Sequence, residues 1–183
     1  MALQAPFHFK KWIDDNRHLL KPPVGNLEVY PNHELIVMVV GGPNSRTDYH
    51  VDPGEEFFHQ LEGDMTLRVV DDGVVRDIEI KEGEIFLLPA WVPHSPQRRA
   101  NTVGLVVERI RKPGELDRFE WYCEKCSRQL YVESVQMTDI VKELPPIFER
   151  YESDVKNRTC KSCGWVMPTR AETRAAQAKA QGG

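Results

Sequence analysis

The sequence predicts a mainly β protein, an antiparallel sandwich or barrel followed by a smaller segment that carries all four cysteines. Between residues 26 and 110 apolar and polar residues alternate with a period of two in short runs, as in half-buried strands. Turn residues separate those runs, for example at 41–43 and 52–54. No helical pattern lies between the runs, which disfavours a parallel sheet with helical crossovers.

The elements follow in order along the chain. Apolar residues at helical spacing between 9 and 20 predict one amphipathic helix, which ends at the Lys-Pro-Pro of 21–23. A short strand at 129–135 and a helix after Pro145-Pro146 are predicted in the cysteine-bearing segment. The alternating runs predict strands at 27–30, 35–40, 56–61, 66–70, 74–80, 85–88 and 102–110.

Length and composition fit one main domain with an appendage. The chain has 183 residues, of which 40% are hydrophobic and 28% charged, as in globular proteins. We divide it into a barrel with its N-terminal helix (1–112), a metal-binding segment (113–168) and a tail (169–183). The tail is rich in Ala, Gln, Arg and Lys and has no apolar anchor, so we expect it to be flexible.

Charge and hydropathy disfavour two classes of partner. Lys+Arg 24 against Asp+Glu 28 leave a net charge of −4, whereas a nucleic-acid-binding chain usually carries a basic excess. The longest apolar run, at 35–40, is far shorter than the about 20 residues of a membrane span. The first twelve residues lack the apolar stretch of a secretory signal. We therefore expect a cytoplasmic protein with neither a membrane nor a nucleic acid as partner.

Two histidines have neighbours that fit a metal site. His50 lies just before the turn at 52–54 and Glu56 soon after it, so the two side chains can converge on one side. His94 follows an apolar strand that ends in prolines. Two imidazoles and a carboxylate from different strands suit non-haem Fe(II) and leave positions open for substrate and dioxygen. The alternative is that all three are ordinary polar residues near strand ends.

His50, Asp52, Glu56 and Gly63 resemble the first cupin motif, in which a second histidine ordinarily stands at the place of Asp52. The resemblance implies a cupin barrel, also called a double-stranded β-helix or jelly roll. Losing one histidine leaves a set of two histidines and one glutamate.

Gly83, Pro89 and His94 resemble the second cupin motif, with Trp91 in place of a glycine and Arg98 in place of a terminal asparagine. Within cupins, residues 9–168 resemble the 3-hydroxyanthranilate 3,4-dioxygenase family in its bacterial form, which has a rubredoxin-like tail. The stretches that carry this match are NSRTDYH at 44–50, EEFF at 55–58, PAWVPHSPQR at 89–98 and VER at 107–109.

The resemblance implies Fe(II) bound by His50, Glu56 and His94. It further implies that Fe(II) and O2 open the ring of 3-hydroxyanthranilate between C3 and C4. The product, 2-amino-3-carboxymuconate semialdehyde, cyclises to quinolinate. These steps belong to tryptophan (kynurenine) degradation and NAD biosynthesis, or to nitroaromatic catabolism.

The family also implies roles for charged residues around the metal. Arg46 is expected to act in catalysis by facing the dioxygen position. Arg98 and Glu108, together with Glu56, are expected to contact substrate, and a guanidinium such as that of Arg98 matches a carboxylate bidentately. Glu108 is expected also to assist proton transfer, and burying it in an apolar strand requires a partner. The neighbouring arginines have no such role and are expected to be solvated: Arg99, Arg109 and Arg111.

Two Cys-x-x-Cys pairs, Cys123/Cys126 and Cys160/Cys163, can complete a tetrahedral site for zinc or iron. The alternatives are a redox dithiol or disulfides. Four thiolates leave no open position, so a structural role is expected, at the contact of a homodimer. The resemblance implies iron in a rubredoxin-like knuckle, and the residues alone leave iron or zinc open.

Two other functions remain as alternatives. One is a cupin oxygenase that acts on another aminophenol or a thiol. The other is a non-catalytic, metal-binding regulator whose cysteine knuckle contacts nucleic acid. The regulator requires a basic stripe at 120–165, where acidic and basic residues are in fact mixed.

Overall fold

The computed structural model describes residues 3–21, 25–44, 46–137 and 140–181. Its helices are α1 (Phe9–Asn16), the 3-10 turn η1 (Arg17–Leu19), α2 (Ile140–Ser153), α3 (Val155–Arg158) and α4 (Arg170–Gln181). Its strands are β1 (Asn26–Glu28), β2 (Leu35–Gly41), β3 (Asp48–Val51), β4 (Glu56–Glu62), β5 (Met65–Asp71), β6 (Val74–Ile80), β7 (Ile85–Leu88), β8 (His94–Arg98), β9 (Val103–Arg109), β10 (Asp117–Tyr122) and β11 (Gln129–Val135).

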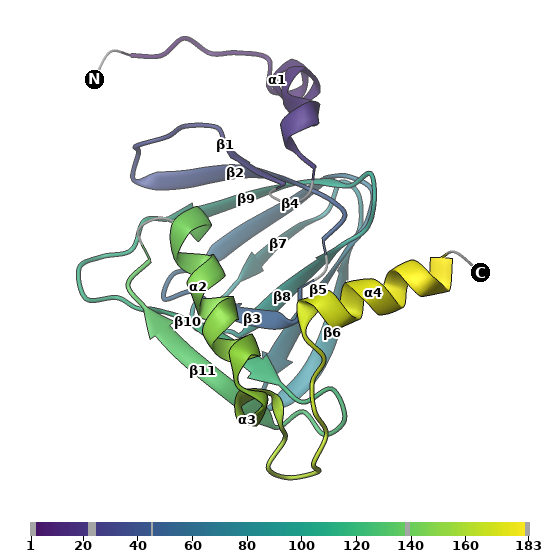
Figure 1. Ribbon diagram of the computed structural model, residues 1–183. Coiled ribbons are helices and arrows are strands. Elements are labelled where there is room, and N and C mark those ends of the chain that lie inside the picture. Colours follow the sequence, from purple (N-terminus) through teal and green to yellow (C-terminus); the bar gives the residue numbers. More distant parts are fainter. Residues whose placement is uncertain (1–2, 22–24, 45, 138–139, 182–183) are drawn as a thin grey trace.

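The strands form two antiparallel sheets that together enclose the barrel in Figure 1. One sheet has the order β1-β2-β9-β4-β7 and the other the order β11-β10-β3-β8-β5-β6. Every pairing between named strands is antiparallel. The predicted mainly β, antiparallel architecture is confirmed.

The alternating runs all fold as strands, each within two residues of its predicted ends, and the strand at 129–135 is β11. Periodicity did not predict β3 and β8, which carry His50 and His94. All four residues of β3 are buried. Two of them, Asp48 and His50, are polar, so a pattern of buried apolar residues does not mark this strand.

The helices differ from the prediction at their ends. The helix predicted at 9–20 ends at Asn16 and continues as the 3-10 turn η1. The helix predicted after Pro145-Pro146 begins earlier, at Ile140, and contains both prolines, so that prediction is wrong about the start. A proline removes one backbone donor, and helix α2 extends through both positions nonetheless. The last helix, α4, projects from the barrel (Figure 1).

Three apolar clusters hold these elements together. The barrel interior is filled from both sheets, and one helix covers each of the two other clusters. Helix α1 covers Val39 and Val103 with Ile13. Helix α2 covers Phe119 and Trp121 of β10. The barrel cluster consists of Phe58, Met65, Leu67, Val69, Ile80, Leu88 and Val106.

The second sheet continues past residue 112, because β10 pairs with β3 and β11 with β10. Phe119 of β10 lies directly opposite His50 of β3. The predicted boundary between the barrel and the metal-binding segment, at residues 112/113, stays a prediction. The second sheet contains strands from both sides of this boundary. Residues after 112 therefore form part of the wall around the histidines.

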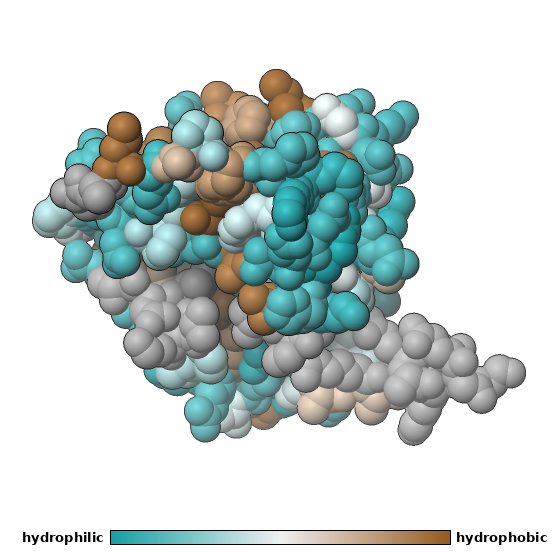
Figure 2. Space-filling model, turned by 90° about the horizontal axis from the view of Figure 1, so that it is seen from above, coloured by the Kyte–Doolittle hydropathy of each residue, from teal (hydrophilic) through white to brown (hydrophobic). Residues whose placement is uncertain are grey.

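The face seen from above carries interspersed hydrophilic and hydrophobic residues, with hydrophilic ones covering much of it (Figure 2). Within the described ranges, none of the helices combines the length and the apolar character that crossing a membrane requires.

Candidate functional site

Three buried side chains from both sheets converge in the barrel. His50 of β3 and His94 of β8 are direct cross-strand neighbours, and Glu56 begins β4 of the other sheet. Nε2 of His94 lies 2.9 Å and Nδ1 of His50 lies 3.5 Å from the same oxygen, Oε1 of Glu56. One ligand atom from each residue lies within 4.8 Å of the others. The structure thus brings together the residues predicted to hold the metal.

Hydrogen bonds behind the two imidazoles set their orientation. Nε2 of His50 lies 2.7 Å from Oδ1 of Asp117. Burial raises the pKa of Asp117, but His50 and Arg111 outweigh burial and lower it, so the carboxylate can only accept. Nδ1 of His94 lies 3.0 Å from the Val92 carbonyl, another pure acceptor. The outer nitrogen of each imidazole therefore donates to its acceptor, and the inner nitrogens face Glu56, where either a proton or a metal ion can bind between nitrogen and carboxylate.

This arrangement fits a divalent metal ion. Oε1 of Glu56 is buried without a hydrogen bond, although both inner nitrogens face it. Burial raises the pKa of Glu56, but His94 and His50 lower it well below its usual value, so the carboxylate is ionised. A buried anion is costly unless cations balance its charge, and here these are either the protonated imidazoles or a metal ion that replaces their inner protons. Two imidazoles and a carboxylate are ligands that non-haem iron takes.

Arg98 is a buried cation beside this cluster. Its side chain is 4% exposed, and its Nη1 donates to Oε1 of Gln60 at 3.3 Å. Burial and the charge of Arg46 lower its pKa to about 10, which leaves it charged at neutral pH. Among the described residues, no carboxylate forms an ion pair with Arg98. A buried guanidinium in this situation can bind the carboxylate of a ligand.

Glu108 has the partner that its burial requires. Arg111 places Nη1 3.3 Å from Oε1 of Glu108. Burial first, and then the charge of Glu56, raise the pKa of Glu108 to about 8.

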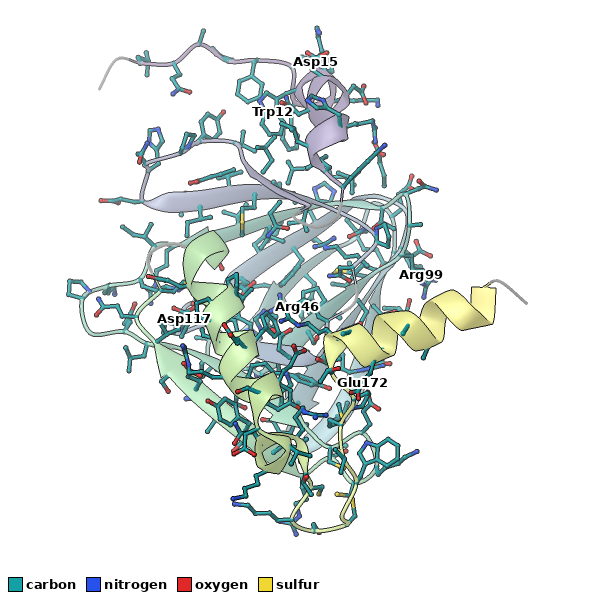
Figure 3. The ribbon with its side chains drawn as sticks, viewed as in Figure 1. Trp12, Asp15, Arg46, Arg99, Asp117 and Glu172 are labelled. Carbon is teal, nitrogen blue, oxygen red and sulfur yellow. The ribbon has the colours of Figure 1, made fainter. Side chains whose placement is uncertain are left out.

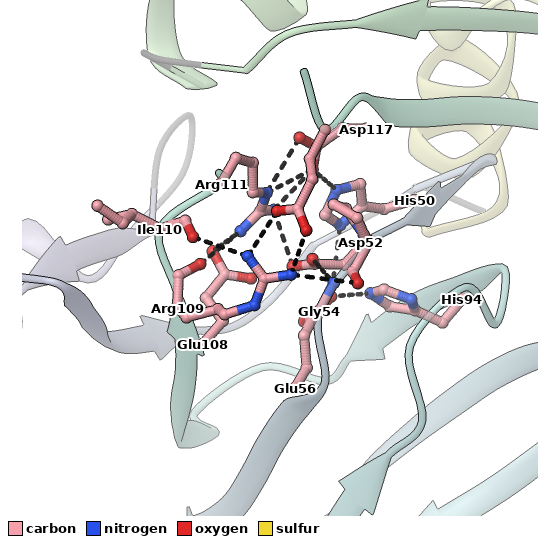
Figure 4. Close-up of polar contacts among 12 residues, drawn as sticks. His50, Asp52, Gly54, Glu56, His94, Glu108, Arg109, Ile110, Arg111 and Asp117 are labelled. Carbon is pink, nitrogen blue, oxygen red and sulfur yellow. Dashed lines mark hydrogen bonds and ion pairs between the residues drawn. The ribbon is translucent and has the colours of Figure 1, made fainter. Parts of the chain in front are cut away.

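Arg111 is only 7% exposed and also pairs with Asp52 and Asp117, so the prediction that it is solvated is wrong (Figure 4). No pattern in the sequence indicated Asp117 or this network, because its members meet only through strand pairing. Arg99 is exposed, as predicted, and Arg109 pairs with Glu115.

Arg46 lies beside the site and forms an ion pair with Asp48. The charge of Glu56 is among the influences that raise the pKa of Arg46, together with Asp48 and against burial. Arg46 also lines a groove of about 580 Å³, together with residues of β3, β5, β6, β8 and β10. In Figure 3 it lies at the centre of the molecule, away from helix α1. Its contact with dioxygen stays a prediction.

At one position where the chain departs from the second cupin motif, Trp91 adopts the backbone conformation typical of glycine. Its backbone has φ of 68°, in the left-handed region that glycine adopts most readily. Its N–H donates to the Asp52 carbonyl at 2.8 Å. The turn between β7 and β8 therefore keeps its conformation without the glycine.

The four cysteines form a separate cluster. The Sγ atoms of Cys123 and Cys163 are 3.6 Å apart, and those of Cys126 and Cys160 are 3.5 Å apart. A disulfide needs about 2.05 Å, so these distances contradict the disulfide alternative. A tetrahedral metal with bonds of about 2.3 Å to sulfur places its ligands about 3.8 Å apart, close to the distances seen.

The two cysteine pairs lie in turns of the same kind. The carbonyl of Cys123 accepts from the N–H of Ser127, and that of Cys160 from the N–H of Gly164. Ser127 and Gly164 both have positive φ. Two matched turns place the four sulfurs around one point, as expected for a closed tetrahedral site.

Comparisons with known proteins show which chains this one is similar to. The family model described as 3-hydroxyanthranilic acid dioxygenase matches residues 1–152. A protein of Jannaschia named 3-hydroxyanthranilate 3,4-dioxygenase is 53% identical over 169 residues, 92% of this chain and 94% of that protein. One of the same name from Xanthomonas oryzae is 51% identical over 166 residues, 91% and 94% of the two chains. A solved cupin-2 domain protein of Shewanella frigidimarina is 16% identical, covers 54% of this chain and 92% of its own, and has a TM-score of 0.44.

Proposed function

The chain belongs to the 3-hydroxyanthranilic acid dioxygenase family, and from this premise we propose how its residues carry out the reaction. It is a metal-binding enzyme of the cupin type that cleaves the ring of 3-hydroxyanthranilate. We assign Fe(II) to His50, Glu56 and His94. The bond cleaved is C3–C4, and the semialdehyde product cyclises to quinolinate.

The observation that carries the substrate assignment is the buried, unpaired Arg98. His94 and Arg98 lie four residues apart on one face of β8, about 13 Å along the strand. This spacing leaves room for one aromatic ring between the metal site and the guanidinium. A 3-hydroxyanthranilate molecule can then place its carboxylate at Arg98 and its hydroxyl and amino groups at the metal.

Each surrounding group has a separate task. When bound, Fe(II) supplies chelation of the hydroxyl and amino groups and a binding position for dioxygen. Arg98 orients the ring through the carboxylate. Glu108, whose pKa of about 8 lies near working pH, accepts the proton of the 3-hydroxyl at a carboxylate oxygen. Arg46 supplies positive charge next to the dioxygen position, and the buried walls exclude water.

The Cys123, Cys126, Cys160 and Cys163 site is proposed to hold iron, or zinc, in a structural role. All its ligand positions are filled by sulfur, which leaves no place for substrate. Extradiol ring cleavage consumes no external electrons, so the reaction requires no electron transfer from this site. The homodimer and the cytoplasmic location predicted from sequence remain part of the proposal, and sedimentation of the purified chain tests the first.

Oxygen uptake by protein loaded anaerobically with Fe(II) tests the assignment. Adding 3-hydroxyanthranilate should consume about one O2 per substrate, whereas anthranilate, which lacks the hydroxyl, should consume none. Uptake with anthranilate would remove the chelating role of the hydroxyl. No uptake with 3-hydroxyanthranilate, with iron present in the His/Glu site, would contradict the substrate and favour another aminophenol.

A further inference from the structure

The buried guanidinium of Arg111 forms ion pairs on both the metal-binding side of the site and the side proposed to bind substrate. Nη2 of Arg111 lies 2.8 Å from Oδ2 of Asp52 and 2.6 Å from Oδ1 of Asp117, and its Nη1 lies 3.3 Å from Glu108 (Figure 4). Asp117 in turn contacts His50. Arg111 therefore connects the group behind a metal ligand to the carboxylate proposed to face the substrate.

Asp117 and Phe119 fix the His50 ring from two sides. Both residues lie on one face of β10, two positions apart. Oδ1 of Asp117 accepts a hydrogen bond from Nε2 of His50, with 2.7 Å between the two atoms. The Phe119 ring stacks on the imidazole, with 5.2 Å between the ring centroids and an interplanar angle of 19°. With its edge and its face both held, the ring keeps Nδ1 directed at Glu56.

Asp52 also takes part in this network. Its Oδ1 accepts from the Gly54 N–H at 2.5 Å, and its Oδ2 pairs with Arg111. At the position where a cupin ordinarily has a second histidine, Asp52 thus has one oxygen in a hydrogen bond and the other in an ion pair without a hydrogen bond. With Asp52 turned to Arg111, the metal site relies on the orientation of the two histidines that remain.

We propose that Asp117 and Arg111 are positioning residues of the metal site. Asp117 fixes the tautomer and direction of the His50 ring. Arg111 pairs with both Asp117 and Glu108 and so fixes their positions relative to each other. The metal-binding and substrate-binding sides are then aligned by one guanidinium. This inference rests on the proposed role of His50 as a metal ligand.

The substitution Asp117→Asn tests the proposal with little change in shape. The asparagine oxygen can still accept from His50, but its NH2 group would face Nε of Arg111, which now lies 3.0 Å from Oδ2 of Asp117. Two donors cannot satisfy each other, so the asparagine side chain must shift away from Arg111, and its hydrogen bond to His50 is weakened. Partners of this kind typically change metal affinity or activity by about 10–100-fold.

Glu120→Gln is the matched control. Glu120 lies on the same strand, three positions from Asp117, and is 4% exposed. It accepts from Arg118 and from the Tyr122 hydroxyl and contacts none of the proposed ligands. A general effect of removing a buried charge from β10 should appear in both variants.

The measurement is release of iron to a coloured ferrous chelator from anaerobically loaded, full-length protein. We expect Asp117→Asn to raise the dissociation constant of the His/Glu iron about 10–100-fold, with the iron of the cysteine site unchanged. Glu120→Gln should match wild type. Wild-type release from Asp117→Asn, or equal weakening of both sites, would overturn the proposal.

Arg111→Lys separates the two halves of the network. Lysine keeps the charge but cannot reach three carboxylates with a planar fork. At saturating Fe(II), we expect Asp117→Asn to recover kcat and KM, whereas Arg111→Lys keeps a raised KM because Glu108 is no longer held. An unchanged KM in Arg111→Lys would remove the link to Glu108. The iron-release experiment needs no turnover, so it stays decisive if the proposed substrate fails.

Discussion

The absence of a side chain at Gly104 of β9 makes room for the Arg98 guanidinium. A Cβ at this position would lie 3.2 Å from Cζ of Arg98 and 2.9 Å from Oε1 of Gln60, and closer still to Nη1 of Arg98. Carbon atoms in normal contact are about 3.5–4.0 Å apart. In Gly104→Ala the guanidinium must therefore move by roughly 0.5–1 Å. Because Arg98 is buried, it cannot move freely into solvent.

The shift should weaken both substrate binding and the fold. Overpacking of this kind costs about 1–3 kcal/mol of stability. A hydrogen bond to a charged group contributes about 1.5–3 kcal/mol, and losing one from a bidentate pair corresponds to about a 10–150-fold weaker interaction. We expect KM for 3-hydroxyanthranilate to rise by that factor in Gly104→Ala, with iron content unchanged.

Initial rates of oxygen uptake against substrate concentration measure this effect. The compound 2-aminophenol, which lacks the carboxylate, serves as the control substrate, and its KM should be the same in wild type and Gly104→Ala. In an Arg98→Ala background the alanine at 104 should add no further loss, since the group that it displaces is absent. An unchanged KM for 3-hydroxyanthranilate, or an equal rise with 2-aminophenol, would refute the reasoning.

Three further predictions follow from the buried charges and the cysteine site. Since the pKa of Glu108 is raised from 4.5 to about 8, its contribution to stability is present below pH 4.5 and is lost as pH rises through 8. We therefore expect the free energy of unfolding of Glu108→Gln, measured in urea without metal in the His/Glu site, to rise relative to that of wild type between pH 5 and 9, by at most about 5 kcal/mol. A constant difference between the two proteins over this pH range would contradict the prediction. Burial lowers the pKa of His50, but Asp117 and Glu56 outweigh burial and raise it to about 10. A proton then competes with the metal, so chelator titrations should give about tenfold weaker iron binding at the His/Glu site for each pH unit lost below 8, and affinity that does not vary with pH would exclude this competition. Cys160→Ser should lower the melting temperature or solubility more than it lowers turnover per iron in the His/Glu site. Lost turnover with normal folding and normal iron at that site would assign the cysteine cluster a role in the reaction.

Strand positions and chemically distinctive residues were predictable from the sequence. The apolar runs at 35–40 and 102–110, bounded by turn residues, marked strands, and β2 and β9 follow those runs closely. Histidines beside carboxylates, and two Cys-x-x-Cys pairs, are rare enough that residue type and spacing indicated metal chemistry. Family motifs then connected residue types to a reaction, which the family match supports.

The network behind the site could be found only in the folded chain. Arg111 follows the end of β9 and Asp117 begins β10, and a charged residue near a strand end is ordinarily solvated. Pairing of β10 with β3 places Phe119 opposite His50 and brings Asp117 to the same imidazole. The contact between Gly104 and Arg98 likewise arises between strands of different sheets.

By itself the sequence determined which side chains could bind a metal, a carboxylate and a second metal, and which runs would become strands. Only the tertiary structure decided that Asp52 pairs with Arg111, that Asp117 orients His50, and that Arg98 is buried without a carboxylate. The physical reason is that periodicity reports which face of a strand meets the core. Strand pairing and register decide which buried charges meet each other there.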